Sequence, residues 1–369
     1  MSHILVQNLP YGAERHGGTA RTKQVVEFLS GIAELHEVPV APVRGRRSVS
    51  EAAQLWGNAP RFARHFATPT GLPDLAMGAR VAAQVPAVRA ALARWGAPKW
   101  FVTEHVSMAV GVKDMLRARG CRIVGVHQNI DSFNAELPKS ERARHIYREL
   151  ELFRMCDLVL SLALEDAWLF RNLDIPAQFL PYVTAPDRIE ELHALGRRRL
   201  TGPRDIDLVL GSATNYITRE GTADLLRFLR AQGTPLRRPL VVVGGGTEVL
   251  RAEFTSPRIE IRGRVDDPEL QELLVRANSL VVHQLRGSGA LIRIADTSWT
   301  GINVYASRHA ARSAPPLPNV QVGETLRELA ALITREHQPL HGPQEVPLEW
   351  REALASARKT FTELGASNP

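Results

Sequence analysis

The sequence of 369 residues has few cysteines, and they do not form a motif. Cys121 and Cys156 are the only two, and neither belongs to a CxxC pair or to a cluster with histidines. Two cysteines exclude a disulfide-rich fold, and their spacing gives no zinc-binding pattern. We therefore expect both thiols to be packing residues and expect no metal site.

Long apolar runs are also missing. No segment approaches the ~18 consecutive apolar residues that suggest a transmembrane helix. The first residues, MSHILVQNLPYG, lack the basic start and the apolar segment of a signal peptide, and their short apolar run is typical of a first strand. These absences favour a cytoplasmic protein.

Acidic residues are outnumbered. The chain has 46 Lys and Arg residues against 39 Asp and Glu residues, a formal net charge of +7 and a pI near 9.8. A positive field favours anionic partners such as nucleotide-sugars, nucleic acid or an acidic membrane surface. Much of the excess is arginine on predicted helices such as 142–154, where Arg and Glu at helical spacing also fit a solvated face. Both a basic binding surface and a solvated helix face therefore stay open as interpretations of these arginines.

Short apolar runs alternate with longer helical patterns along the whole chain. The predicted strands are 4–9, 99–105, 121–127, 157–163, 177–183, 206–213, 239–246, 258–265, 279–285, 303–306 and 319–323. This alternation is typical of an α/β fold with a parallel sheet between two layers of helices. Because one core rarely exceeds about 250–300 residues, we expect two doubly wound domains.

A polar, basic stretch interrupts the alternation near the middle of the chain. ELHALGRRRLTGPRD at 191–205 is the predicted linker. We place an N-terminal domain at 1–187 and a C-terminal domain at 188–347. A final helical pattern begins at Leu348 and is long enough to pack elsewhere, so 348–369 is expected to join the N-terminal domain.

Ligands of open α/β sheets bind beyond the carboxyl ends of the strands, so these positions supply the candidate residues. In HQLRGSGALIRIADTSWTG (283–301), the turn Gly287-Ser288-Gly289 leads directly into a predicted helix. A glycine turn at a helix N-terminus suits a phosphate group, although many such turns have no function.

The same helix carries two charges in an otherwise apolar run. Arg293 and Asp296 are three residues apart and share one helix face. Because a buried Arg/Asp pair seldom adds net stability, we expect Arg293 to meet a diphosphate and Asp296 a ribose. A structural salt bridge is the alternative. The only DxD, Asp205–Asp207, is predicted to be the solvent-facing start of a strand rather than a metal site.

Strand ends of the first half are also polar. Gly17 and Gly18 open a predicted helix, and His127 ends a predicted strand. A lone histidine is as often structural as functional in such a place. Further candidates for the acceptor side are Arg21, Glu104, His105 and Asn129.

In this order and spacing, the motifs resemble the retaining GT-B glycosyltransferases, in particular glycosyltransferase family 4. The C-terminal half contributes RPLVVVGGGTEVL, IEIRGRVDDPELQELLVRANSLVVHQL and GSGALIRIADTSWTGINVYAS. The N-terminal half contributes GGTARTKQVVEFL, VHQNID and CDLVLSLALEDAWLF. No single motif is specific, but together they cover nearly the whole chain.

The resemblance implies a GT-B fold: two Rossmann-like domains facing across a cleft, with the C-terminal helix crossing back to the first. It implies transfer of a sugar from a UDP-, GDP- or dTDP-sugar to an acceptor hydroxyl with retention, without a metal or a tightly bound cofactor. The basic charge fits an acceptor such as a glycan, a lipid-linked glycan or modified DNA, and peripheral contact with the inner face of an anionic membrane.

Matching positions imply roles for individual residues. The implied catalytic residues are His127, Arg219 and Arg293. The implied donor-binding residues are Gly17, Gly18, Gly211, Arg264, Gly287, Ser288, Gly289, Ala290 and Asp296.

The sequence departs from the family pattern at several positions. Ser288 stands where many members have a glutamate, Asn303 where proline is common, and Ser212 where arginine is frequent. The donor sugar is therefore open, and a non-catalytic, nucleotide-binding GT-B protein is one alternative. The other, an NAD(P)-dependent oxidoreductase, requires a GxGxxG after the first strand, and NLPYGAERHGG does not fit it.

Overall fold

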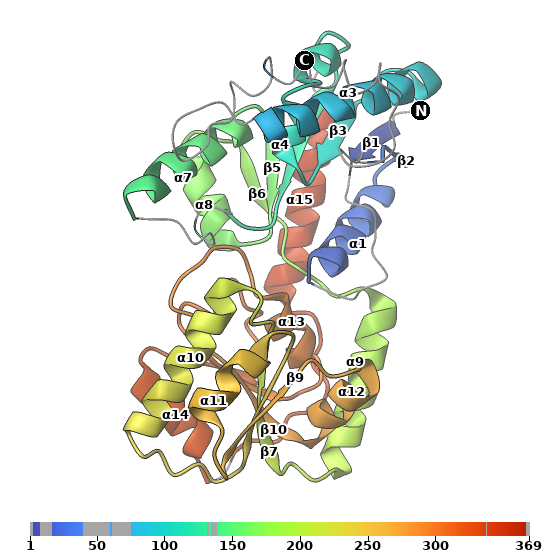
Figure 1. Cartoon of the computed structure of the whole chain (residues 1–369). Helices are drawn as coiled ribbons and strands as arrows, with labels where there is room; N and C mark the ends of the chain where they lie inside the picture. Colours follow the sequence, from blue (N-terminus) through green and yellow to red (C-terminus); the bar gives the residue numbers. More distant parts are fainter. Residues whose placement is uncertain are drawn as a thin grey trace. The chain divides into compact units, whose positions relative to one another are not determined.

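The computed structural model describes residues 3–7, 17–39, 60, 75–130, 133, 139–336 and 338–366. The chain divides into two compact units, coloured along the sequence in Figure 1. Unit 1 comprises Met1–Ser132, Leu137–Leu180 and Ala353–Pro369, and unit 2 comprises Phe133–Glu136 and Pro181–Glu352.

In its described residues, unit 1 contains a six-stranded parallel sheet in the order β2-β1-β3-β4-β5-β6. Its strands are β1 (His3–Gln7), β2 (Glu34–Glu37), β3 (Trp100–Thr103), β4 (Arg122–His127), β5 (Leu158–Ser161) and β6 (Ala177–Phe179). Its helices are α1 (Gly17–Ser30), α3 (Leu75–Trp95), α4 (Val106–Ala109), α5 (Lys113–Arg117), α7 (Lys139–Phe153) and α8 (Leu164–Asn172).

Unit 1 has two hydrophobic cores, one on each face of its sheet, because successive apolar side chains of a strand point to opposite faces. In β1, Ile4 and Val6 pack on the face that α1 covers, whereas Leu5 packs on the face of α3, α4, α5, α7 and α8. Successive side chains of a strand point to opposite faces, so a strand that is apolar throughout must be covered on both. This is the layered architecture predicted from the sequence.

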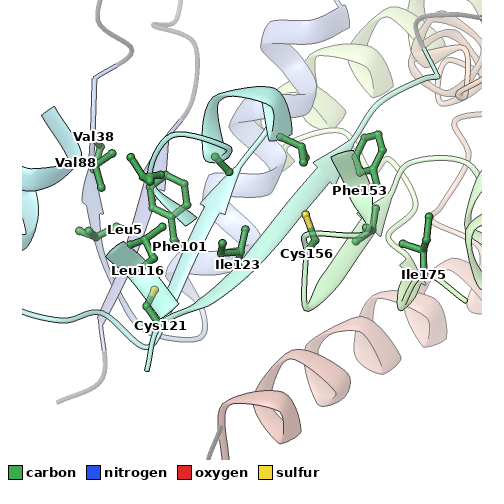
Figure 2. Packing of buried hydrophobic residues seen from close by; sticks show 14 of the residues in the cluster. Leu5, Val38, Val88, Phe101, Leu116, Cys121, Ile123, Phe153, Cys156 and Ile175 are labelled. Atoms are coloured by element: carbon green, nitrogen blue, oxygen red, sulfur yellow. The ribbon is translucent and has the colours of Figure 1, made fainter. Parts of the chain in front are cut away.

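Both cysteines lie in one of these cores. Figure 2 shows Cys121 and Cys156 among Phe101, Ile123 and Phe153. Burial raises the pKa of each thiol to about 12, so the reactive thiolate is scarce at neutral pH. The expected packing role fits this environment.

Unit 2 repeats the arrangement. In its described residues the parallel sheet has six strands in the order β12-β11-β10-β7-β8-β9. The strands are β7 (Ile206–Leu210), β8 (Leu240–Val243), β9 (Ile259–Gly263), β10 (Ala277–Val282), β11 (Asn303–Ser307) and β12 (Val320–Gly323). The helical segments are α9 (Pro186–Thr201), α10 (Tyr216–Ala231), η1 (Thr247–Leu250), α11 (Arg251–Phe254), α12 (Asp267–Arg276), α13 (Ile292–Ser298) and α14 (Leu326–Thr334).

The last helix, α15 (Leu348–Ala366), contributes to both units. Near its start, the ring of Trp350 meets Trp299 of unit 2 at a centroid distance of 6.3 Å. Further along, Ala357 and Phe361 are fully buried in the core of unit 1 that also holds Ile4. The predicted return of the C-terminal helix to the first domain is confirmed.

The segment predicted as a linker is mostly helix. Helix α9 runs from Pro186 to Thr201 and therefore includes most of 191–205. Leu192 and Leu195 are buried. Arg199 is only 2% exposed, and it donates to the carbonyl oxygens of Leu274, at 2.7 Å, and Ala277. The arginines looked like linker residues in the sequence, but one of them ties this helix to the second sheet.

Asp207 was predicted to face solvent, and this is wrong. It is 1% exposed and accepts hydrogen bonds from Ser279 Oγ at 2.6 Å and from Asn278 at 3.3 Å. Asp205 is bound by Arg276 through two hydrogen bonds of 3.0 and 2.7 Å. The DxD is therefore engaged in interactions that fix the amino-terminal end of β7.

None of the helices in the described ranges combines the length and the apolar character that crossing a membrane requires.

Candidate functional site

Arg293 of α13 lies at the carboxyl end of β7. A Cβ atom on Gly211, the residue after β7, would stand 3.1 Å from Nη1 and 3.3 Å from Cζ of Arg293. Any side chain at Gly211 would therefore press on the guanidinium. The structure brings together these two predicted donor-site residues, although they are 82 positions apart in the chain.

The guanidinium of Arg293 is half-buried, and it forms no hydrogen bond or ion pair with the described residues; its Nε atom is fully buried. Burial, and then the charge of nearby Arg312, lowers the pKa of Arg293 to about 10. A half-buried cation without a counter-charge is costly, because water compensates for its charge only in part and no carboxylate does so. The surroundings of Arg293 therefore favour the binding of an anion.

The salt bridge between Arg293 and Asp296, which was the alternative to ligand binding, does not occur within the described structure. Oδ1 of Asp296 instead accepts hydrogen bonds from Thr184 Oγ1 at 2.6 Å and Tyr182 at 3.1 Å. The indole of Trp299 donates in turn to Thr184 at 2.8 Å. Burial raises the pKa of Asp296 above its usual range.

The second carboxylate oxygen of Asp296 has no hydrogen-bond partner among the residues described. One oxygen is thus held by the segment after β6, and the other remains for a ligand. This arrangement is compatible with the predicted ribose contact but does not test it.

The GSG turn differs from its prediction. Helix α13 begins at Ile292, so Ala290 and Leu291 separate it from Gly289. The turn therefore does not lead directly into the helix, and a helix of seven residues offers only a small dipole. Gly287 and Gly289 have φ angles of 121° and 72°, values that residues with a side chain rarely adopt.

Side chains from the segment after β11 hold the GSG turn. His309 Nε2 donates to the carbonyl oxygen of Gly287 at 3.1 Å, and Arg312 donates to that of Ser288 at 2.7 Å. Ser288 is 7% exposed. Hydrogen bonds from His309 and Arg312 therefore hold the backbone of the turn, and no sequence motif indicated either residue.

Arg219 lies in the first turn of α10. Its guanidinium is 5.6 Å from the ring centre of Tyr216, and that of Arg286 is 5.0 Å from the same ring. Arg286 also donates to Glu220 at 3.1 Å, whereas Arg219 forms no side-chain hydrogen bond or ion pair with any described residue. Of the two cations beside Tyr216, Arg219 is the one available to a phosphate.

Arg264 lies apart from these residues. It follows β9, an edge strand three positions from β10 in the sheet. Strands are spaced by about 5 Å, so roughly 15 Å separates Arg264 from the GSG turn along the sheet. Arg264 is exposed, and its predicted place beside the nucleotide base remains a prediction.

In unit 1, Glu104 joins two strand ends to α1. Its carboxylate accepts from Thr22 Oγ1 at 2.6 and 2.8 Å and from Gln128 at 3.2 Å. Burial raises the pKa of Glu104, an effect that these bonds and the charge of Arg21 oppose. Arg21 is itself fully buried and donates to Gln24 at 2.6 Å. The structure thus brings together Glu104 and Arg21 near the carboxyl edge of the first sheet.

His127 is more deeply buried than its predicted role beside a sugar suggests. It is 1% exposed, and its ring lies edge-on to Phe153 and Phe170 at 5.2 and 4.8 Å. Nδ1 is 3.1 Å from Ser161 Oγ, while Nε2 is buried without a hydrogen-bond partner in the part of the chain described. Burial, and then the charge of Arg21, lowers the pKa of His127 to about 3.

The remaining predicted residues of unit 1 are Gly17, Gly18, His105 and Asn129. Gly17 and Gly18 are the first residues of α1. The backbone N–H of His105 donates to Thr103 Oγ1 at 3.1 Å at the start of α4. Asn129 follows β4 and is half-buried. None of these positions shows by itself a catalytic arrangement.

We predict that His127 makes the protein less stable in acid. Because its folded pKa is below the unfolded value of 6.5, the unfolded chain binds the extra proton, and stability falls as the pH drops below 6.5. This group should remove about 2 kcal/mol of the unfolding free energy between pH 7 and pH 5. Denaturant unfolding of wild type, His127→Gln and His127→Phe at both pH values measures this. An equal pH-dependent loss in all three proteins would contradict the prediction.

No group of three or more potential metal-ligating side chains occurs among the residues that the structure describes. The groups that follow the strands of unit 2 include the guanidinium groups of Arg219, Arg286 and Arg293. Guanidinium groups suit anions.

Compared with known proteins, the fold is that of the GT-B glycosyltransferases, and it matches them over essentially the whole chain. The similarity is in structure: no family model matches the sequence. No curated protein matches it either.

The similar structures include sucrose-phosphate synthase from Thermosynechococcus elongatus, with a TM-score of 0.61, 16% identity and coverage of 99% of this chain and 97% of that chain. A UDP-forming α,α-trehalose-phosphate synthase from Burkholderia xenovorans has a TM-score of 0.61 and 16% identity, and the match covers 100% of this chain and 99% of that chain. The catalytic domain of starch synthase IV from Arabidopsis thaliana, bound to ADP and acarbose, has a TM-score of 0.59 and 9% identity, and the match covers 99% of both chains. At these identities the likeness shows the fold, and the GT-B prediction is confirmed.

Proposed function

We propose that the protein is a retaining glycosyltransferase that uses a nucleoside diphosphate sugar as donor. The observation that carries this proposal is the half-buried guanidinium of Arg293, which has no described partner and lies at the carboxyl end of β7. In open α/β sheets this edge is where ligands bind, and a diphosphate supplies the missing negative charge.

The proposed reaction breaks the bond between the anomeric carbon and the diphosphate oxygen. The acceptor oxygen bonds to the same face of that carbon, and the acceptor's proton leaves with the diphosphate. Negative charge grows on the diphosphate as an oxocarbenium-like sugar forms. Arg293 and Arg219 stabilise this charge, the kind of preorganised electrostatics that often dominates catalysis. Protein cations thereby perform a role that other enzymes give to a metal ion.

The other predicted residues have supporting roles in this proposal. Asp296 accepts from a ribose hydroxyl through its second oxygen, and the amides of the GSG turn contact phosphate. His127 and the polar residues near Glu104 belong to the sugar and acceptor side. Two of the similar proteins are named for UDP formation or for bound ADP, which supports a nucleoside diphosphate as the leaving group. The acceptor class stays open among glycans, lipid-linked glycans and modified DNA.

The test is direct. UDP, GDP, ADP and dTDP are added to the purified protein, and the melting temperature is recorded, because a ligand that binds only the folded state raises it. Release of the nucleoside diphosphate is then measured with the corresponding sugar donors and no acceptor. Stabilisation together with slow release supports the proposal. Stabilisation without release from any donor favours the non-catalytic nucleotide-binding alternative. If no nucleotide stabilises the protein and no donor releases its nucleoside diphosphate, both functions are refuted.

A further inference from the structure

Arginines gather at the amino-terminal edge of the second sheet, opposite the strand ends that carry the candidate donor site. Parallel strands are joined by helices that run back to the edge where the next strand begins, so α9, α10, α12 and α14 end there. These helix ends and the loops before the strands include Arg197, Arg198, Arg204, Arg230, Arg237, Arg238, Arg258, Arg276 and Arg335.

About half of these arginines are neutralised by carboxylates. The ion pairs are Arg198 with Glu272, Arg230 with Glu253, Arg237 with Glu336 and Arg276 with Asp205. Arg238 lies near the buried carboxyl group of Asp207 and interacts with its charge.

Four arginines remain without a carboxylate partner among the described residues, and we call them the basic edge: Arg197, Arg204, Arg258 and Arg335. Arg335 donates only to the neutral side chain of Gln321, at 2.9 Å. Strands β7 and β9 are two positions apart in the sheet, so the arginines in the loops before them lie roughly 10 Å apart along the edge. The basic edge therefore concentrates positive charge on one side of unit 2.

Arginines at helix ends have an ordinary explanation. A cation in the last turn of a helix interacts favourably with the partial negative charge of the helix C-terminus. Arg198, Arg230 and Arg276 occupy such turns in α9, α10 and α12. Arg204 and Arg258 lie beyond the helix ends, in the loops before β7 and β9, so this explanation does not cover them.

Two exposed leucines lie at the same edge. Leu200, in the last turn of α9, is 43% exposed, and Leu340 is 48% exposed. Leu340 follows Pro339, whose carbonyl oxygen accepts from Asn303, the first residue of β11, at 3.0 Å. A single exposed leucine is common on protein surfaces, but these two stand among unpaired arginines. The edge thus combines positive charge with apolar side chains.

This combination fits a lipid surface better than a nucleic acid. Proteins that contact nucleic acid phosphates use backbone amides and helix N-termini as well as arginine, whereas this edge presents the carbonyl ends of four helices. Attraction to an anionic lipid surface acts over about 8 Å at physiological salt and needs no close contact with each phosphate. Apolar side chains have a place in the headgroup region of a bilayer.

We propose that the basic edge is a peripheral docking surface for an anionic lipid membrane, in which its arginines lie near lipid phosphates and Leu200 and Leu340 enter the headgroup region. The proposal goes beyond the proposed function and does not rest on it, because docking needs no nucleotide. Of the acceptors left open above, a lipid-linked glycan is the one that such a surface favours.

The experiment measures how much protein sediments with lipid vesicles. The vesicles contain phosphatidylcholine alone or with about one third phosphatidylglycerol, and binding is recorded at low and high salt. One variant is Arg197→Gln with Arg258→Gln, and the other is Leu200→Ser with Leu340→Ser. All four side chains are exposed, so both variants should fold.

The control is Arg308→Gln with Arg351→Gln. It removes the same two positive charges from exposed positions after β11 and in α15, outside the basic edge. Its binding should stay within about twofold of wild type, because more distant charges are screened by salt. The control therefore separates the position of the charges from the net charge of the protein.

We expect wild type to bind the phosphatidylglycerol vesicles at low salt, to lose most of this binding at high salt and to leave phosphatidylcholine alone in solution. The arginine variant should bind the anionic vesicles roughly tenfold more weakly or less, since each basic residue near an anionic surface adds to the attraction. The leucine variant should bind several-fold more weakly, because serine does not enter the headgroup region.

Three results would overturn the proposal. Wild type that does not bind anionic vesicles has no such surface, and a control that loses as much binding as the arginine variant responds to net charge alone. Unchanged binding of the leucine variant removes the reason for choosing a membrane. Duplex DNA serves as a second probe: if the arginine variant loses DNA binding but not vesicle binding, the basic edge recognises nucleic acid instead. The proposed function is tested separately by nucleotides.

Discussion

Replacing Arg293 with methionine is expected to stabilise the unliganded protein and to weaken nucleoside diphosphate binding roughly 100-fold. Methionine fills similar space without a charge, so the free energy of unfolding should rise by about 1–2 kcal/mol. Binding should fall because the ligand then brings its diphosphate into a site that has lost its half-buried cation. Urea unfolding and calorimetry measure the two effects, which have opposite signs.

The control for this experiment is Arg308→Met. Arg308 is also an arginine of unit 2, but its side chain is 79% exposed and it pairs with Glu324. An exposed pair contributes little, so both stability and binding should stay within about 1 kcal/mol of wild type. A large loss of stability in Arg293→Met would instead show that the guanidinium has a structural role, and would remove the main support for the donor site.

A gain in stability together with a loss of nucleotide affinity would show that Arg293 serves binding and not folding. Residues that serve the fold normally cost stability when they are removed. A half-buried charge without a counter-charge is kept only if something else benefits from it, and strained or unpaired groups are a known cost of binding sites. Arg293 is such a group in the described structure, whereas Arg286 in the same region has Glu220 as a partner.

Much of the fold was predictable because most strands are apolar on both faces. Strand β10, ANSLVV, is buried at every position, and its short length and its two valines favour a strand over a buried helix. Strand β2, ELHE, was missed because it lies at the edge of its sheet and has mixed polar residues. Helix α9 was predicted to be a linker because the stretch 191–205 is polar and basic and contains glycine and proline, but Arg199 is buried.

The candidate site was predictable as a set of positions but not as a set of contacts. The spacing of Arg293 and Asp296 indicated one shared helix face, yet α13 is short and the two side chains have different neighbours. The partners of Asp296 and of the GSG turn come from Tyr182, Thr184 and the 309–312 segment. These residues are ordinary in sequence, and only the folded chain brings them to Asp296 and to the GSG turn.

For Asp296, the expected result is a loss of ribose recognition without a loss of fold. In Asp296→Asn, Oδ1 can still accept from Thr184 and Tyr182, but the second position becomes an NH2 group, which cannot accept from a hydroxyl. We expect nucleoside diphosphate affinity to fall roughly tenfold. The 2′,3′-dideoxy form of the same diphosphate should bind wild type and variant equally, because it has no hydroxyl to donate.

Thr184→Val completes this experiment, because it removes the 2.6 Å bond to Oδ1 and leaves the carboxylate in place. If Oδ1 is held in order to aim Oδ2 at the ribose, Thr184→Val should weaken the ribonucleotide and spare the dideoxy form, as Asp296→Asn does. The double variant should then lose less than the sum of the two single changes, since both act on one contact. Equal losses for both nucleotides would place Asp296 in the packing of α13 against the segment after β6, and outside ribose recognition.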